Sequence, residues 1–290
     1  MNIRTVGVLG HPNRPNTAPV ANRIRDSFQR RGVEVWSEQQ WVDADLSERL
    51  SKTSLVVAIG GDGAMLRAAR AAAIFGVPVL GVNMGHLGFL TEVDAPDQWD
   101  TACEALLKGS YWIERRMMVH VEARHADGGE IHTRSEALND IVISRGNVTR
   151  MIRVPIYIDE HWTTTYHSDA LIIATATGST AYALACGGPI LPPELRNILV
   201  VPVAPHLSLD RPIVLPDGAE VRALVDADSG VEPILAVDGA KLCDLHHGDE
   251  IRVRASDYTA QFVRLRDRNY FYRSLLDRLE PRVDPPKSES

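Results

Sequence analysis

The sequence predicts two domains of different class: an α/β domain with a parallel, Rossmann-like sheet, then a β-rich, sandwich-like domain. Three observations support this prediction. Strand and helix patterns alternate over residues 5–109, which is typical of parallel sheets. A turn with three glycines, at residues 60–63, joins an apolar strand to a helix. From Tyr111 onward, strand patterns are frequent and long helical patterns are scarce.

The α/β domain is expected over residues 1–115, and its elements follow from the spacing of apolar residues. Short apolar runs predict strands at residues 5–9, 33–36, 55–59 and 78–82. Helical spacing predicts helices at residues 20–28, 46–50, 64–73 and 96–109. Gly32 ends the first helix as a left-handed cap, and Gly76 ends the third. In the last helix we expect Trp99, Cys103, Leu106 and Leu107 on one side.

The glycine turn is the first candidate site. Gly60, Gly61 and Gly63 lack a Cβ, so backbone N–H groups can approach a ligand closely. The following helix directs its first N–H groups and the positive end of its dipole the same way, which attracts phosphate. Asp62, the one side chain in the turn, could bind a metal ion, accept a proton from an attacking hydroxyl, or cap the helix.

A loop at residues 83–90 should run beside the glycine turn, because ligands bind beyond the carboxyl ends of parallel strands. It contains Gly85 and Gly88, and it is either a satisfied turn or part of the site.

The β-rich domain is expected over residues 116–265. Strand patterns at residues 117–123 and 131–133 flank residues 127–129, a hairpin signal. Further strands are expected at residues 137–144, 154–158, 170–175, 198–203, 221–225, 235–237 and 250–254. The basic stretch 264–278 is interpreted as a solvated face. A C-terminal helix and tail, residues 266–290, should pack back on the body through the amphipathic segment 270–279, with a disordered end from residue 281.

Polar groups gather at strand ends in the second domain. Asn139 and Asp140 precede a strand, where they either cap a turn or hold ribose hydroxyls. The strand at residues 170–175 leads into a second strand–glycine–helix turn, residues 176–189, in which Tyr182 offers a flat face for a base. One such turn in each domain suggests a phosphate-rich ligand bound between the domains. Asp238 and Gly239 are interpreted as a hairpin turn.

The composition argues against several function classes. The chain has 290 residues, 44% hydrophobic and 24% charged, which is enough for two domains with cores. Its net charge is −7 without a basic cluster, which argues against nucleic acid as the main partner. No apolar run reaches the roughly 18 residues of a membrane span, and the N-terminus lacks a signal-peptide core. Three distant cysteines indicate a reducing cytoplasm without a disulfide framework.

Together these segments resemble those of NAD kinases, enzymes of the GGDG-containing, diacylglycerol kinase-like superfamily that use ATP or polyphosphate. The motifs occur in the family's order, from residue 60 to past residue 240. They lie at residues 60–63, 83–90, 138–140, 169–172, 177–182, 187–189 and 211–214. Lipid kinases and phosphofructokinases share the GGDG motif, whereas the motifs at residues 83–90 and 177–182 are much more specific.

The resemblance implies transfer of the γ-phosphoryl group of ATP, or of polyphosphate, to the 2′-hydroxyl of the adenosine ribose of NAD, which makes NADP. It implies Mg²⁺ or another divalent ion with the ATP, and a homodimer or homotetramer. Asp62 is then the proton acceptor, and Gly60, Gly61 and Gly63 bind the phosphate donor. The implied NAD-binding positions are Asp62, Gly63, Arg67, Asn139, Asp140, Arg150, His167, Asp169, Thr180, Ala181, Tyr182, Ala183, Leu184, Ala185 and Ala204.

Within this set, the resemblance assigns the adenosine side to Asn139 and Asp140 and the nicotinamide amide to Asp169. The chain departs from the family pattern on this NAD side. Asp140 stands where Glu is usual, Ala176 replaces Pro, Ala183 and Ala185 replace Ser, Ala170 replaces Gly, and Ala240 replaces a frequent Gln. The Ser and Gln changes remove hydrogen-bonding groups, which leaves the choice between NAD, NADH and another nucleotide open.

Two alternatives remain. A GGDG kinase acting on a lipid or another nucleoside predicts an apolar acceptor groove for the lipid, whereas Asn139, Asp140 and Asp169 are polar. A catalytically silent NAD-binding regulator is favoured by the alanines near Tyr182, but Asp62 and the complete glycine turn argue against it.

Overall fold

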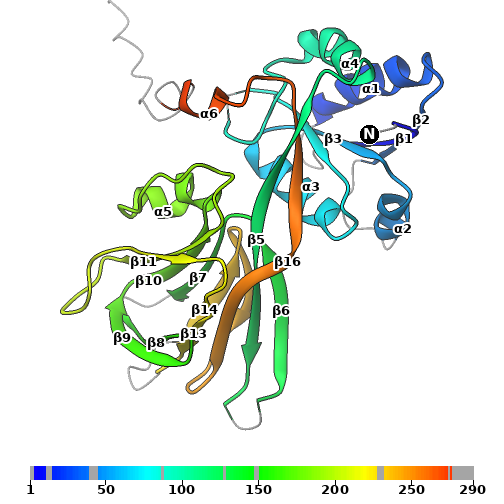
Figure 1. Cartoon of the computed structure of the whole chain (residues 1–290). Helices are drawn as coiled ribbons and strands as arrows, with labels where there is room; N and C mark the ends of the chain where they lie inside the picture. Colours follow the sequence, from blue (N-terminus) through cyan, green and yellow to red (C-terminus); the bar gives the residue numbers. More distant parts are fainter. Residues whose placement is uncertain are drawn as a thin grey trace, which may run out of the picture. The chain divides into compact units, whose positions relative to one another are not determined.

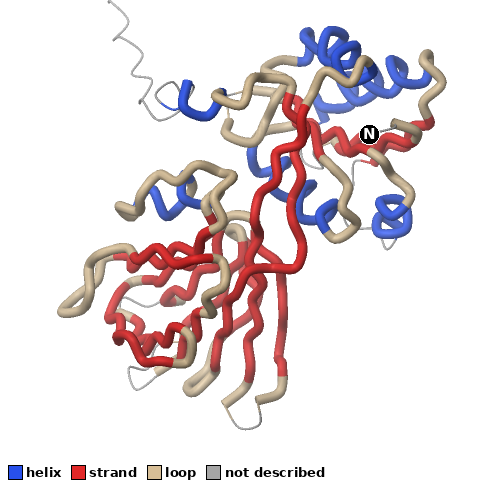
Figure 2. Tube along the Cα trace, viewed as in Figure 1, coloured by secondary structure: helices blue, strands red, loops and turns tan. Residues whose placement is uncertain are grey.

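The computed structural model describes residues 3–10, 15–38, 45–85, 88–126, 129–146, 150–226, 232–273 and 275 (Figures 1 and 2). The chain forms two compact units. The α/β unit comprises residues 1–65, 80–112 and 263–290, and the β-rich unit comprises residues 66–79 and 113–262. Within the described ranges, every helix is too short or too polar to span a bilayer.

The α/β unit contains the predicted parallel sheet. Its strands are β1 (Thr5–Leu9), β2 (Glu34–Glu38), β3 (Leu55–Ile59) and β4 (Val79–Val82), in the order β2-β1-β3-β4. β1 pairs in parallel with both β2 and β3, and every residue of β3 is buried, as its continuous apolar run predicts. Its helices are α1 (Ala18–Gln29), α2 (Asp45–Ser51), the start of α3 (Asp62–Ala73) and α4 (Trp99–Leu107).

Helices α1 and α4 lie side by side on one face of this sheet (Figure 1). The rings of Phe28 and Trp99 meet edge to face at 5.5 Å between centroids. Gly32 has the left-handed φ of +76° expected of a cap. The helix expected at residues 96–109 is a 3-10 turn, Pro96–Gln98, followed by α4. Leu107, expected beside Trp99, is instead 40% exposed, because Ala102 occupies the buried side with Cys103 and Leu106.

The β-rich unit is a sandwich of two sheets, as predicted. One sheet is antiparallel, in the order β12-β11-β10-β7-β14-β15. Its strands are β7 (Asp140–Arg145), β10 (Ala170–Thr175), β11 (Asn197–Val203), β12 (Ile213–Pro216), β14 (Pro233–Val237) and β15 (Ala240–Asp244). The other contains β5 (Trp112–Arg124), β6 (Ile131–Ala137), β8 (Ile152–Ile158), β9 (His161–Ser168), β13 (Val221–Leu224) and most of β16 (Glu250–Arg264).

Both sheets of the β-rich unit contribute to one apolar core. Val119, Val154 and Val253 from one sheet join Ile143 and Leu171 from the other, all between 0% and 1% exposed. Figure 2 shows how strands dominate this unit. The hairpin of β5 and β6 is antiparallel, as expected, although Asp127 and Gly128 at its turn lie outside the described residues.

The C-terminal part of the chain differs from the sequence prediction. The strand expected at residues 250–254 continues to residue 264 as β16. Arg264, assigned to a solvated face, is 0% exposed and forms a buried ion pair with Glu92. That interpretation was therefore wrong for Arg264. Helix α6 (Tyr270–Arg273) follows, with Tyr270 and Phe271 buried, while residue 274 and residues 276–290 lie outside the described residues.

Candidate active site

The glycine turn lies between β3 and α3, at the carboxyl end of the parallel sheet. Gly60 has φ +149°, a backbone conformation that favours glycine, and its N–H donates to the carbonyl of Val82 on β4 at 2.9 Å. A Cβ built on Gly61 or on Gly63 meets nothing within 4 Å. The space beside these two residues is therefore open to a ligand, next to the first turn of α3.

The Asp62 carboxylate holds the loop at residues 83–90. Its Oδ2 accepts the N–H of Phe89 at 2.7 Å, and its Oδ1 accepts the N–H of Leu90 at 2.9 Å. A Cβ on Gly88 would lie 2.0 Å from Asp62 Oδ1, so this approach requires glycine at position 88. Asp62 thus has a fixed orientation at the open turn, and each oxygen keeps acceptor capacity for another donor. His86 and Leu87 lie outside the described residues.

In the β-rich unit, Asp238 organises the segment that carries Asn139 and Asp140. Its carboxylate accepts the N–H groups of Leu138, Asn139 and Asp140 at 3.0, 2.7 and 3.1 Å. The Asp238 side chain is 1% exposed and lies 3.3 Å from Nε of Arg70, so a cation balances its charge. Asp238 has φ +48°, and its own N–H donates to the carbonyl of Asp140.

The turn after β10 fixes the same segment from the other side. The N–H of Thr175 donates to the carbonyl of Asn139 at 2.9 Å, and its hydroxyl donates to the carbonyl of Leu138. A Cβ on Gly178 would lie 2.1 Å from the Asn139 carbonyl oxygen, so glycine permits this close packing. The backbone around Asn139 is consequently held by Asp238, by Thr175 and by its contact with Gly178.

Asn139, Asp140 and Asp238 lie together in one pocket of about 360 Å³. It is lined by Asn139, Asp140, Val142, Ala181, Tyr182, Ala236, Asp238 and Gly239. Burial, and secondarily the charge of Asp238, raise the pKa of Asp140 to about 7. Asp140 can therefore act as a hydrogen-bond acceptor or as a donor close to neutral pH. Partial burial, with smaller effects from Cys186, Asp169 and Asp140, raises the pKa of Tyr182, so its phenol stays protonated.

Comparison with known proteins identifies the family. The model of the ATP-NAD kinase N-terminal domain matches residues 16–111, and that of the C-terminal domain matches residues 138–265. The chain belongs to the NAD kinase family. An NAD kinase from Chloroflexus aurantiacus is 39% identical over 277 residues, which cover 96% of this chain and 99% of that protein. One from Moorella thermoacetica is 37% identical over 285 residues, or 96% and 90% of the two chains.

Solved structures show the same fold. A yeast NADH kinase complexed with NADH superimposes with a TM-score of 0.84 and 25% identity, covering 98% of this chain and 91% of that chain. An NAD kinase from Archaeoglobus fulgidus in complex with ATP gives a TM-score of 0.74 at 24% identity, covering 93% and 97%. The expected family and fold class are thereby confirmed.

The NAD kinase motif at residues 177–182 forms a 3-10 turn, Gly178–Thr180, and then the short helix α5 (Tyr182–Ala185). Ala181 and Tyr182 line the pocket, and Tyr182 is 45% exposed. Thr180 and Leu184 are half-buried and Ala185 is exposed. Ala183 is 0% exposed and packs in an apolar cluster with Val142 and Ile172. Its methyl group thus faces the interior, and alanine suits this position through packing.

Asp169, predicted for the nicotinamide amide, lies at a strand end near some of the further predicted NAD-lining positions. Asp169 precedes β10, and its Oδ1 lies 3.0 Å from Nη1 of Arg145. Its N–H donates to the carbonyl of Val203, next to the exposed Ala204, which has φ +46°. His167 is half-buried on β9, and Arg150 is exposed. The structure therefore brings Asp169 and Ala204 together but gives Arg150 no place in the pocket at Asp140.

Arg67 lies in a different cavity from the other predicted residues. This cavity, of about 780 Å³, is lined by α3, β5, β6 and β16. Its lining residues are Arg67, Arg70, Ala71, Ile74, His120, Glu122, Arg134, Ser135, Glu136, Arg254, Asp257 and Tyr258. Some of these charges are paired with one another, as Arg254 is with Asp257 at 3.9 Å. The mixture of signs gives the cavity no clear ligand chemistry.

A divalent ion would have few protein ligands here. Among the described residues, no three His, Cys, Asp or Glu side chains lie close enough together to hold a metal ion. Mg²⁺ does not require such a cluster, because it keeps several waters and usually takes one or two carboxylates together with substrate phosphates. Asp62 is the carboxylate available at the glycine turn.

Sequence reasoning missed four residues that shape the site. Asp238 does lie in the expected hairpin turn, between β14 and β15, but its ion pair with Arg70 on α3 was not predicted. Glu92 and Arg264 form a buried pair behind the loop at residues 83–90. Of these four residues, only Asp238 belonged to a recognisable local motif, the Asp-Gly pair at residues 238–239. The other contacts join residues that are distant in sequence.

Proposed function

We propose that this NAD kinase transfers the γ-phosphoryl group of ATP to the 2′-hydroxyl of the adenosine ribose of NAD. The observation that carries the proposal is the fixed Asp62 carboxylate at the open glycine turn. A nucleotide phosphate can approach Gly61 and Gly63 without meeting a side chain of these residues. Polyphosphate, which presents the same anhydride oxygens, is the alternative donor.

Asp62 is proposed to orient the attacking hydroxyl and to accept its proton late. Phosphoryl transfer has a loose transition state, so positioning and charge neutralisation supply most of the catalysis. A carboxylate is a weak base toward a neutral hydroxyl before attack, but it is a good acceptor for the hydroxyl proton once the O–P bond forms. The two N–H donors from Phe89 and Leu90 keep this carboxylate in one orientation.

The acceptor is proposed to bind through the pocket of the β-rich unit. Asn139 and Asp140 offer an amide and a carboxyl to the two ribose hydroxyls, and Tyr182 offers an aromatic face to a base. Asp169 is proposed to accept a hydrogen bond from the nicotinamide amide. Further predicted NAD-lining positions are Arg67, Arg150, His167 and Ala204.

The proposal also includes the divalent metal ion, the cell compartment and the oligomeric state of the enzyme. Mg²⁺ bound to the donor phosphates would neutralise their charge. A cytoplasmic enzyme agrees with three cysteines that remain free thiols in the structure. A homodimer or homotetramer is proposed from the family resemblance, and light scattering of the purified protein tests it.

The identity of the acceptor is a second question, because one similar structure is that of a yeast NADH kinase complexed with NADH. Alanines at positions 183 and 185 remove hydroxyls that the family usually carries. Only Ala185 is exposed, since Ala183 lies in the apolar cluster. We therefore expect NAD to be the acceptor. The preference for NAD over NADH should change less than it would if both alanines had removed hydroxyls from the pocket.

A coupled assay with ATP, Mg²⁺ and NAD tests the proposal by following NADP formation, with NADH and polyphosphate in parallel reactions. Asp62→Asn should lower kcat by roughly 10²- to 10⁴-fold, as expected for a positioned general base, while NAD still binds in calorimetry. An Asp62→Asn protein with near-normal kcat would show that Asp62 is structural. NAD binding by the wild type without any phosphorylated product would favour the silent regulator.

A further inference from the structure

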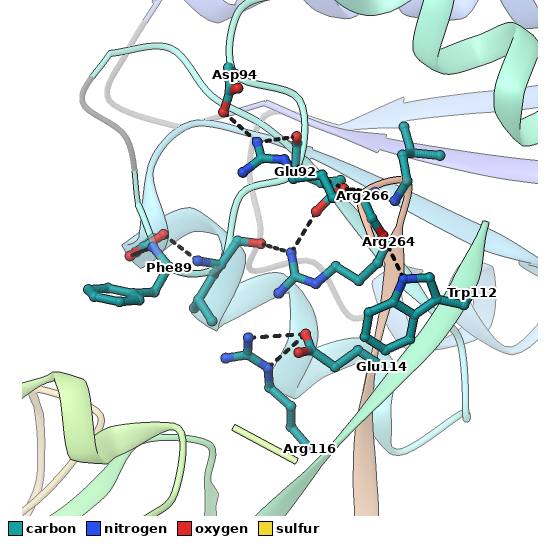
Figure 3. Close-up of polar contacts among 11 residues, drawn as sticks. Phe89, Glu92, Asp94, Trp112, Glu114, Arg116, Arg264 and Arg266 are labelled. Carbon is teal, nitrogen blue, oxygen red and sulfur yellow. Dashed lines mark hydrogen bonds and ion pairs between the residues drawn. The ribbon is translucent and has the colours of Figure 1, made fainter. Parts of the chain in front are cut away.

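The buried pair of Glu92 and Arg264 lies behind the loop that Asp62 holds (Figure 3). Their side chains are 1% and 0% exposed, and Nη1 of Arg264 lies 3.1 Å from Oε2 of Glu92. The other carboxylate oxygen, Oε1, accepts the N–H groups of Leu265 and Arg266 at 2.8 and 2.9 Å. Glu92 is therefore saturated with donors from the end of β16.

Arg264 also reaches Leu90, the residue next to the candidate catalytic group. Its Nη1 donates to the carbonyl of Leu90 at 3.1 Å, while the N–H of the same Leu90 donates to Asp62 at 2.9 Å. Leu90 is thus held at both of its backbone polar groups, by Arg264 on one side and by Asp62 on the other. The guanidinium of Arg264 further lies 4.9 Å from the ring centroid of Tyr270, which restricts its orientation.

We propose that Glu92 and Arg264 are positioning residues for phosphoryl transfer, and that they act by fixing Leu90 and, through it, the Asp62 carboxylate. The proposal rests on the proposed role of Asp62. Three observations support it: the hydrogen bonds form a continuous chain, Glu92 and Arg264 are buried, and the Asp62 carboxylate packs so close to Gly88 that a Cβ there would overlap it.

The buried location explains why a charged pair is used. Loss of one partner leaves the other charge uncompensated in the interior, so the pair has one stable arrangement. Each terminal nitrogen of a guanidinium carries two hydrogens. Nη1 of Arg264 donates one of them to the carbonyl of Leu90 and the other to Glu92. Misplacement of a catalytic group by about 1 Å can lower a rate about a hundredfold, so a rigid backing for Asp62 has a direct effect on turnover.

Glu92→Gln and Asp94→Asn form a matched pair of variants. Gln keeps an acceptor for the backbone N–H groups but presents an amide NH₂ to Arg264, which removes that hydrogen bond. Asp94 lies in the same segment, but it is 48% exposed and its ion pair is with Arg266, at the surface side of the segment, while Glu92 pairs with the buried Arg264. We expect kcat to fall about 10- to 100-fold in Glu92→Gln with KM for NAD within about threefold, and Asp94→Asn to resemble the wild type.

Arg264→Lys covers the case in which Glu92→Gln does not fold. Lysine keeps both charges, but its shorter side chain cannot reach Leu90 and Glu92 together. This variant should also lose kcat, and it should add no further loss in an Asp62→Asn background, because both changes act on one group. A kcat within about twofold of the wild type in folded Arg264→Lys protein, or fully additive losses, would overturn the proposal.

Amide hydrogen exchange gives a readout that does not require activity. In Arg264→Lys, the N–H groups of Phe89 and Leu90 should exchange about tenfold faster or more, whereas amides of the buried strand β3 should keep their protection. Unchanged exchange at both positions would contradict the proposal even if the protein proved to have another activity. An inactive wild type with faster exchange in the variant would instead contradict the proposed function alone.

Discussion

Gly88 shows how the absence of one methyl group lets the loop pack against the Asp62 carboxylate, the proposed proton acceptor. In Gly88→Ala, the new Cβ would lie 2.0 Å from Asp62 Oδ1, so either the carboxylate or the loop has to move. We expect kcat to fall about 10- to 100-fold. Gly85→Ala is the control in the same loop, since its Cβ meets nothing within 4 Å. Steady-state kinetics of both variants give the kcat values that test this prediction. Equal kcat values would mean that the loop can accommodate a Cβ at residue 88 without moving Asp62.

If Asp140 holds the ribose as proposed, NAD binding should depend on pH. With a pKa of about 7, its carboxyl is mostly protonated at pH 6 and mostly ionised at pH 8. If the ionised form accepts both ribose hydroxyls, KM for NAD should fall about tenfold over this range. Asp140→Asn should remove the dependence. A wild-type KM that stays flat from pH 6 to pH 8 would show that this carboxyl does not hold the ribose.

The same pKa has a consequence for stability, with the opposite sign to the usual Asp. The folded-state pKa of about 7 lies above the ordinary aspartate pKa of 3.8, so the folded protein binds more protons than the unfolded chain between these two pH values. Stability therefore falls as pH rises from about 4, and the full cost is reached above about pH 7. Asp140→Asn should stabilise the protein at pH 8 by up to about 4 kcal/mol and have little effect at pH 4 in thermal unfolding.

At the scale of elements, Asp238 ties the β14–β15 turn to the start of β7. We expect Asp238→Asn to raise KM for NAD about tenfold, because one carboxylate supports three N–H groups and an asparagine cannot replace it. It should also move the KM profile to lower pH, since the Asp238 charge contributes to the raised pKa of Asp140.

Asp159→Asn is the matched control for that change. Asp159 also has φ +48°, and it accepts one backbone N–H, that of Glu220, at a turn on β8 and β9. It should leave KM unchanged. An Asp238→Asn protein with a normal KM and a normal pH profile would mean that β7 and the turn after β10 hold Asn139 without help.

The elements themselves were largely predictable. β1, β3 and β10 begin and end at the expected residues, because each is a continuous apolar run between polar or glycine boundaries. β9 was missed, since its Thr-rich, half-exposed sequence lacks such a run. Asp238 was correctly predicted to lie in a hairpin turn, but its hydrogen bonds to three backbone N–H groups were not predicted, because those groups lie 98 to 100 residues away. Local patterns locate the polar residues, but they do not show which distant backbone groups these residues bind.

At the scale of the whole molecule, the division into an α/β part and a β-rich part was correct, and boundaries at residues 115 and 265 stay a prediction. The sequence interpretation of residues 264–278 was wrong for Arg264 for a physical reason. An arginine in a basic stretch is usually solvated, and its burial requires a carboxylate that the fold supplies from residue 92.

The separation of Glu92 from Arg264 has a consequence for biosynthesis. The two residues are 172 positions apart, and ribosomes add about 5–20 residues per second, so roughly 10–30 s pass between them. During that interval Glu92 has no cation from β16, and an uncompensated carboxylate resists burial. The segment around Glu92 can therefore reach its final packing only after Arg264 has been made. A chain that ends before β16 lacks both the contact of Arg264 with Leu90 and a strand of the β-rich sheet.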